Sequence, residues 1–201
     1  MSEISNEIDN TESDDKSART RLELLDWIQC AIAAVILGVL IFVFIGRTIG
    51  VDGPSMQITL LQSDRVVISN LFYTPSGGDI IVFKAPADQF EHPLVKRVIA
   101  TAGQTIDIDS ENGNVFIDGV LLSEPYIRSM KTSSRGFQGP LLIPEGYVFV
   151  MGDNRDRSTD SREDVIGLVD TRYILGKVIF VLLPGADENG IRDWSRIGTA
   201  S

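Results

Sequence analysis

The chain has 201 residues, enough for one domain with its own core and additional terminal segments. Its formal net charge is −10, and no stretch forms the basic stripe of a nucleic-acid-binding surface, so nucleic acid is excluded as a partner. A single cysteine, Cys30, and a single histidine, His92, exclude an internal disulfide, a cysteine-cluster metal site and most multi-histidine zinc sites. The surroundings of His92 favour a solvated loop residue, so the base of any nucleophilic chemistry is expected elsewhere.

Residues 1–26 differ in composition from the rest of the chain. They include eight acidic and three basic side chains and no aromatic residue. Such a segment buries too little apolar surface to offset the entropy lost on ordering. We therefore predict a disordered acidic tail.

Residues 27–46, WIQCAIAAVILGVLIFVFIG, are an apolar run whose only strongly polar member is Gln29. As a helix this run would be about 30 Å long, which matches the hydrocarbon core of a bilayer. A buried soluble helix would carry a polar stripe, and a cleaved signal peptide would have a shorter apolar region followed by a small-x-small site. The run shows neither feature, so we predict a retained transmembrane anchor in which Cys30 is an inert apolar residue.

Basic residues flank this run unequally. Lys16, Arg19 and Arg21 lie before it, whereas Arg47 is the only basic residue close behind it. Because Lys and Arg are retained on the cytoplasmic side of a membrane, we predict a single-pass protein with a cytoplasmic tail and residues 47–184 outside the cell membrane.

After the anchor the apolar pattern changes to short β-rich runs separated by turn residues. The Asn112-Gly113 and Asp118-Gly119 dipeptides flank one such run and indicate hairpins. The pattern predicts a mainly β protein, with an antiparallel all-β domain of coiled sheets, a small insertion at about 105–145 and a loosely held C-terminal tail at 185–201. The expected strands are 65–68, 79–83, 94–99, 115–117, 147–151 and 173–183.

Two segments of this domain carry candidate chemistry. Ser55 follows Gly53-Pro54, in backbone that can turn sharply and expose a hydroxyl, although serines in such turns are common. Residues 152–162, GDNRDRSTDSR, follow an apolar strand and contain three aspartates and three arginines. This run is either a solvated loop or a network in which each charge has a partner, and composition leaves both readings open.

Four segments in order make the chain similar to a type I signal peptidase. They are Ser55-Met56-x-x-Thr59-Leu60, Gly78-Asp79-Ile80-Ile81-Val82-Phe83, Lys96-Arg97-Val98-Ile99-Ala100 with Gly103, and Gly152-Asp153-Asn154-Arg155-Asp156 with Ser158, Asp160-Ser161-Arg162 and Gly167. The similarity extends over about 26–184. The last segment is long and specific, whereas the first is specific only in company with the others.

The resemblance implies that Ser55 is the nucleophile and Lys96 the general base. It also implies that the Ser158 hydroxyl helps orient the lysine amine and that Asp160 and Arg162 form a supporting ion pair. The chemistry of Lys96 agrees, because a lysine can accept a proton near neutral pH only where burial lowers its pKa. Strand alternation places Leu94 and Val98 on the same face as Lys96, in an apolar setting. Lys84 is the next candidate.

The resemblance further implies that the Ser55 backbone N–H holds the oxyanion. Gly53 stands where other members carry a serine hydroxyl, so a second donor would be backbone or water. The chain departs from the family pattern at Ile58, Ala102 and Gln104. These departures affect efficiency and substrate range more than the presence of activity.

The implied function is a membrane-bound serine endopeptidase that removes signal peptides from exported preproteins after small-x-small sites, without a metal or other cofactor. Its partners are secretory preproteins and the lipid bilayer, and its oligomeric state is left open. The main alternative is a non-catalytic anchored relative that acts as a binding or regulatory partner in secretion. A self-cleaving Ser/Lys regulator and a Ser-His hydrolase that uses His92 are less favoured.

Overall fold

The computed structural model describes most of the chain in two units that are considered separately, Met1–Val43 and Phe44–Ser201. The described residues are 21, 23–39, 47–85, 90–109, 111–127, 133–187 and 190–200.

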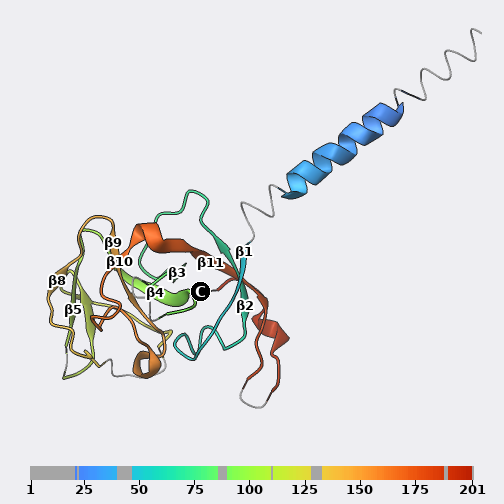
Figure 1. The fold of residues 1–201 in the computed structure, drawn as a ribbon. Helices are drawn as coiled ribbons and strands as arrows, with labels where there is room; N and C mark the ends of the chain where they lie inside the picture. Colours follow the sequence, from blue (N-terminus) through green and yellow to red (C-terminus); the bar gives the residue numbers. More distant parts are fainter. Residues whose placement is uncertain are drawn as a thin grey trace, which may run out of the picture. The chain divides into compact units, whose positions relative to one another are not determined.

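In the first unit, residues 23–39 form an α-helix with exposed side chains (Figure 1). The predicted membrane segment overlaps this helix over 27–39, and its remainder lies outside the described residues, as does most of the predicted acidic tail. Within the part of the chain that the structure describes, no helix combines the length and the apolar character required to cross a membrane.

The second unit is mainly β, with a seven-stranded antiparallel sheet in the order β1-β2-β11-β3-β4-β9-β10. Register shifts interrupt the pairing of β11 with β2 and β3, and that of β4 with β9, and such bulges curl a sheet. The predicted curled antiparallel architecture is therefore confirmed. The strands are β1 (Arg47–Gly50), β2 (Arg65–Ser69), β3 (Ile80–Phe83), β4 (Leu94–Thr101), β9 (Tyr147–Met151), β10 (Val169–Asp170) and β11 (Ile174–Leu183).

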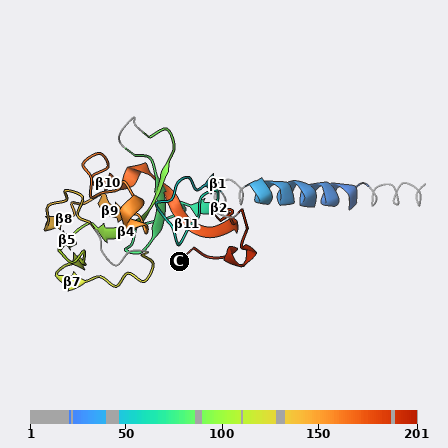
Figure 2. The same ribbon diagram turned by 90° about the horizontal axis from the view of Figure 1, so that it is seen from below.

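A second, four-stranded sheet lies within the segment 105–145 that the sequence set apart. Its order is β7-β6-β5-β8, and Figures 1 and 2 show β5 and β8 at the end of this unit away from β1 and β2. Asp118 and Gly119 join β6 to β7 with φ values of 52° and 77°, the left-handed conformation of a tight hairpin turn. The strands are β5 (Thr105–Ile108), β6 (Val115–Ile117), β7 (Val120–Leu121) and β8 (Leu141–Leu142).

The centre of the large sheet is buried on both faces. All four residues of β3 are buried, and so are residues 95–100 of β4. One apolar cluster contains Val95, and a second cluster contains Val98. A lysine in the middle of β4 therefore cannot extend to water on either side of the sheet.

The C-terminal segment, for which the sequence predicts a loosely held tail, contacts this sheet through strand β11. Isolated β-bridges join Val181 to Gly198 and Ala186 to Arg192. The 3₁₀ turn η3 (Trp194–Arg196) places Arg196 against the buried carboxylate of Asp64, with an N–O distance of 2.7 Å. Only two short 3₁₀ turns precede it in the described parts of this unit, η1 (Arg155–Arg157) and η2 (Thr171–Tyr173).

Candidate active site

Ser55 is presented by a closed loop that runs from Val51 to Asp64. The Val51 N–H donates to the Asp64 carbonyl at 2.8 Å, which joins the two ends of the loop. Met56 and Leu60 are buried in the apolar cluster beneath β2 and β11. These two side chains hold the loop against the sheet, and Ser55 stays half-buried at its surface.

The loop brings Ser55 to Lys96, a residue of the central strand β4. Lys96 Nζ donates a hydrogen bond to Ser55 Oγ at 2.7 Å, and the lysine is only 3% exposed. The two residues are 41 positions apart in the chain. The structure therefore brings together the two side chains that the sequence proposes as nucleophile and base.

Burial lowers the pKa of Lys96 to about 8, because a charged ammonium is poorly solvated inside the sheet. Nearby charges modify this effect. The carboxylate of Asp160 opposes the decrease, the guanidinium of Arg162 adds to it, and Asp153 opposes it more weakly. A lysine with this pKa exchanges its proton in the pH range where a general base must work.

Residues 152–162 hold the Ser55 loop from the other side. The Asn154 N–H donates to the Ser55 carbonyl at 3.0 Å, and Asn154 Nδ2 donates to the Pro54 carbonyl at 3.2 Å. Gly152 lies so close that an added Cβ would be 2.5 Å from the Ser55 carbonyl oxygen and 2.3 Å from Ser158 Oγ. Only glycine fits at this position.

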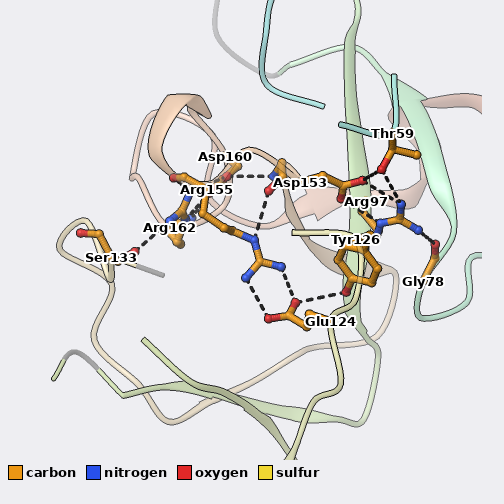
Figure 3. Close-up of polar contacts among 11 residues, drawn as sticks. Thr59, Gly78, Arg97, Glu124, Tyr126, Ser133, Asp153, Arg155, Asp160 and Arg162 are labelled. Carbon is orange, nitrogen blue, oxygen red and sulfur yellow. Dashed lines mark hydrogen bonds and ion pairs between the residues drawn. The ribbon is translucent and has the colours of Figure 1, made fainter. Parts of the chain in front are cut away.

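The ion pair expected between Asp160 and Arg162 is present and fully buried, with Arg162 Nε 2.8 Å from Asp160 Oδ1. The Asp160 carboxylate also accepts the Gly152 N–H at 3.0 Å. Burial alone would raise the pKa of Asp160, but the hydrogen bonds and charge of Arg162 outweigh it and hold this pKa below its ordinary value. Figure 3 shows Asp160 and Arg162 within a larger set of polar contacts.

Ser158 does not make the contact expected from the resemblance. It is buried beside Gly152, and its Oγ forms no hydrogen bond with any residue that the structure describes. The hydroxyl is near enough to the Asp160 carboxylate to favour its ionised form, but without hydrogen-bond geometry. The contact to the Lys96 amine is made by Ser55 alone among the described side chains.

Gly53 lies at the entrance of the Ser55 loop with φ of +84°, a conformation that favours glycine. Nothing lies within 4 Å of the position that its Cβ would occupy. The Ser55 N–H donates to no backbone carbonyl of the described residues.

A second ion pair, which the sequence did not indicate as part of the site, links the neighbour of Lys96 to the Ser55 loop. Arg97 donates to Asp153 through Nε and Nη2, both at 2.8 Å, and Thr59 Oγ1 donates to the same carboxylate at 2.5 Å (Figure 3). Thr59 belongs to the Ser55 loop. The motifs contained all three residues, but their pairing depends on the fold.

Arg97, Asp153, Arg155, Asp160 and Arg162 form a buried charged cluster. Two further residues of this charged cluster come from outside the motifs. Glu124 pairs with Arg155, and the ring of Tyr126 lies 4.0 Å from the guanidinium carbon of Arg97 (Figure 3). The sequence could have indicated Glu124 only indirectly. A buried arginine in a charged run requires a carboxylate, which can come from elsewhere in the chain.

The other titratable candidates lie apart from Ser55. His92 and Lys84 are exposed, and Lys177 pairs with Asp79 at 2.5 Å. Lys131 lies outside the described residues. In the described part of the chain, no group of three or more His, Cys, Asp or Glu side chains is placed to hold a metal ion.

Comparison with known proteins gives a consistent result. The family model for signal peptidase, peptidase S26, matches residues 24–183. Signal peptidase I of Bacillus licheniformis is 34% identical in an alignment of 182 positions that covers 86% of this chain and 95% of that protein. Signal peptidase I S of Bacillus subtilis is 35% identical, over 80% of this chain and 90% of that protein. Probable signal peptidase I-1 of Synechocystis sp. is 34% identical, over 83% of each chain.

The matched region includes the whole Ser55 loop, strand β4 and the charged cluster. The chain therefore belongs to the signal peptidase family, peptidase S26, and is a serine endopeptidase of its type I class.

Proposed function

We propose that this enzyme removes signal peptides from exported preproteins, with Ser55 as the nucleophile and Lys96 as the general base. The observation that carries the proposal is the 2.7 Å contact between Lys96 Nζ and Ser55 Oγ inside the sheet. With a pKa of about 8, the amine is neutral in about one molecule in ten at pH 7. The neutral amine can accept the proton of the Ser55 hydroxyl.

In the first step, Ser55 Oγ attacks the carbonyl carbon of the scissile peptide bond and its proton passes to Lys96 Nζ. The resulting oxyanion is stabilised by the Ser55 N–H, which has no backbone acceptor among the described residues. Gly53 offers no hydroxyl, so any second donor is backbone or water. The ammonium then gives its proton to the leaving amine, and an acyl-enzyme remains.

In the second step, water attacks the acyl carbon and passes a proton to the neutral Lys96 amine. The Ser55 oxygen leaves and takes up the proton that the amine received. The enzyme returns to its starting state, and the two products are a carboxylic acid and an amine.

We propose that the substrate binds as an extended strand. Such a segment pairs with a sheet edge through backbone hydrogen bonds, and side chains at alternate positions then face the enzyme. The resemblance implies small residues at −1 and −3 of the cleavage site, with −2 turned away. A preprotein series varied singly at −3, −2 and −1 tests this point, because equal tolerance at −1 and −2 would indicate a different Ser/Lys protease.

We also propose that residues 27–46 anchor the enzyme in the membrane with the tail 1–26 in the cytoplasm. This proposal rests on the sequence of the run and on the basic residues before it. Ser55 follows Gly46 by nine positions, so an extended chain keeps it within about 30 Å of the bilayer surface. Protease added to intact cells should remove a tag at Ser201 and spare one at Met1, and the reverse pattern would contradict this topology.

The proposed chemistry is tested by three variants assayed on a preprotein. Ser55→Ala and Lys96→Arg should each abolish cleavage, because the first removes the nucleophile and the second replaces the base by a guanidinium that stays protonated. Lys84→Arg is the matched control, since Lys84 is exposed, and it should keep most of the activity. Cleavage by Lys96→Arg would show that the base lies elsewhere.

A further inference from the structure

Each of the three buried arginines of the charged cluster, Arg97, Arg155 and Arg162, is contacted by a residue of the insertion 105–145. The contacts are the Tyr126 ring 4.0 Å from Arg97, the Glu124 carboxylate at 3.0 Å from Arg155 Nη1, and the Ser133 carbonyl at 2.8 Å from Arg162 Nη1 (Figure 3). The insertion therefore completes a cluster whose other members surround Ser55 and Lys96.

Glu124 is linked to the backbone of Ser55 through Arg155 and Gly152. The Arg155 side chain is 0% exposed and that of Glu124 is 6% exposed, so neither is solvated by water. Arg155 Nε donates to the Gly152 carbonyl at 3.1 Å. Gly152 in turn packs against the Ser55 carbonyl so closely that a Cβ would not fit. A displacement of Arg155 must therefore move the backbone that contacts Ser55.

The contact of Tyr126 reaches the same loop by a second path. The ring stacks on Arg97, which follows Lys96 directly and holds the Asp153 carboxylate through two hydrogen bonds. That carboxylate accepts the hydroxyl of Thr59 in the Ser55 loop. The Tyr126 hydroxyl donates to Glu124 Oε1 at 3.1 Å and thereby connects the two paths.

We propose that Glu124 and Tyr126 are positioning residues that hold the Ser55 loop and strand β4 at the separation required for the Ser55–Lys96 contact. The proposal rests on the proposed function of that pair. Glu124 and Tyr126 touch neither reacting atom, and they act through Arg155 and Arg97. Misplacement of a nucleophile by about 1 Å can lower a rate about a hundredfold, so small displacements of the loop are sufficient.

The first test compares Glu124→Gln with Glu145→Gln in the full-length enzyme. Glu124→Gln keeps the shape of the side chain and removes its charge, and it should lower kcat by about tenfold to a hundredfold with KM changed less than about threefold. Glu145 is exposed, and its side chain makes no hydrogen bond or ion pair with the described residues of the cluster, so Glu145→Gln should change both constants less than about twofold. Amide hydrogen exchange at 51–64 should be faster in Glu124→Gln alone.

A double variant separates positioning from a general loss of folding. If Glu124 acts through Arg155, adding Glu124→Gln to Arg155→Gln should cause little further loss of kcat, because the path is already interrupted. If Glu124→Gln does not fold, Tyr126→Leu replaces it. This variant should lower kcat about tenfold, and Tyr126→Phe, which keeps the ring over Arg97, should retain more activity than Tyr126→Leu.

The results distinguish this inference from the proposed function. A wild-type enzyme that does not cleave preproteins would overturn the proposed function. A wild-type enzyme that does, together with folded Glu124→Gln and Tyr126→Leu variants of unchanged kcat, would overturn the inference. Activity that falls only in proportion to the folded fraction, with unchanged exchange at 51–64, would show a merely structural role and would overturn it as well.

Discussion

Two polar segments of this fold differ sharply in how far they are buried. Residues 152–162 and 185–200 each follow a strand and are rich in charged and turn-forming residues. In the first, eight of the eleven residues are buried, and Asp153, Asp160 and Arg162 make paired contacts inside the protein. In the second, most of the described residues are exposed, and the Arg196 side chain pairs with the buried carboxylate of Asp64.

The difference shows that the contribution of a charged side chain to stability depends on whether the side chain is buried or exposed. A buried carboxylate is stable only where nearby groups satisfy it, so the removal of one partner leaves an uncompensated charge. An exposed pair is solvated by water, and its loss costs little. The effects of substitutions should therefore decrease from the buried charged cluster to the exposed surface.

The largest effect is expected for Asp160→Asn. Arg162 would remain buried without its carboxylate, which should lower the free energy of unfolding by about 3–5 kcal/mol and abolish cleavage. Because the pKa of Asp160 is lowered in the folded state, its contribution is present above the ordinary value of 3.8 and is lost as pH falls through the folded pKa. Denaturant titrations of both proteins should therefore differ most near neutral pH. An equal difference at all pH values would contradict this account.

A smaller effect is expected for Gly152→Ala. The new Cβ would lie 2.5 Å from the Ser55 carbonyl oxygen and would displace the loop or Ser158. The cost in unfolding free energy should be about 1–3 kcal/mol, with a larger loss of kcat because the Ser55–Lys96 contact is disturbed. Gly50→Ala is the control for a glycine replacement without steric conflict, since its Cβ would meet open space and its φ is not in the left-handed region. Wild-type kcat in Gly152→Ala would contradict the tight packing.

Arg196→Ala tests the ion pair between the C-terminal segment and the buried carboxylate of Asp64. Arg196 donates to both oxygens of Asp64 and to the Thr59 carbonyl at 3.1 Å, so its loss affects the Ser55 loop. We expect a cost of about 1–3 kcal/mol in thermal or chemical unfolding and a reduction of kcat of several fold. Arg192→Ala, which removes only a hydrogen bond to the Pro184 carbonyl, should have a smaller effect. Equal effects of the two variants would mean that Asp64 does not depend on Arg196.

The smallest effect is expected for Arg172→Ala. Arg172 pairs with Asp170 at 2.6 Å, but its side chain is 83% exposed. The substitution removes a guanidinium that water already solvates and opens the Asp170 carboxylate to water, so neither the unfolding midpoint nor kcat should change measurably. A clear loss of stability would show that exposed pairs matter more in this fold than the comparison of the two segments implies.

Among the strands of the large sheet, the sequence predicted β2, β3, β4, β9 and β11, which have four to ten residues and are rich in apolar side chains. It missed β1, β5, β7, β8 and β10, which have only two to four residues. Alternation placed Leu94 and Val98 on the face of Lys96, but both faces of β4 are buried, so alternation alone could not identify this lysine.

The candidate site was predicted where its residues lie in the motifs and missed where pairing depends on the fold. Ser55, Lys96, Asp160 and Arg162 were proposed from the motifs, and the structure places Ser55 in contact with Lys96 and Asp160 in contact with Arg162. Glu124 is 31 positions from its partner Arg155, and Arg196 is 132 positions from Asp64. Local sequence patterns cannot indicate pairs of residues that are so far apart in the chain. The orientation of Ser158 also depends on packing beside Gly152, and there the expectation from the resemblance was not met.

The central claim is that a buried, neutral Lys96 is the base for Ser55. The most direct measurement is the pH dependence of kcat/KM for a preprotein substrate, because this ratio reports the groups that titrate in the free enzyme. Since burial lowers the pKa of Lys96 to about 8, kcat/KM should rise with pH through a midpoint near 8 as the amine loses its proton. A midpoint near 10.5, the ordinary value for lysine, or one near about 6.5, as for a histidine, would contradict the account.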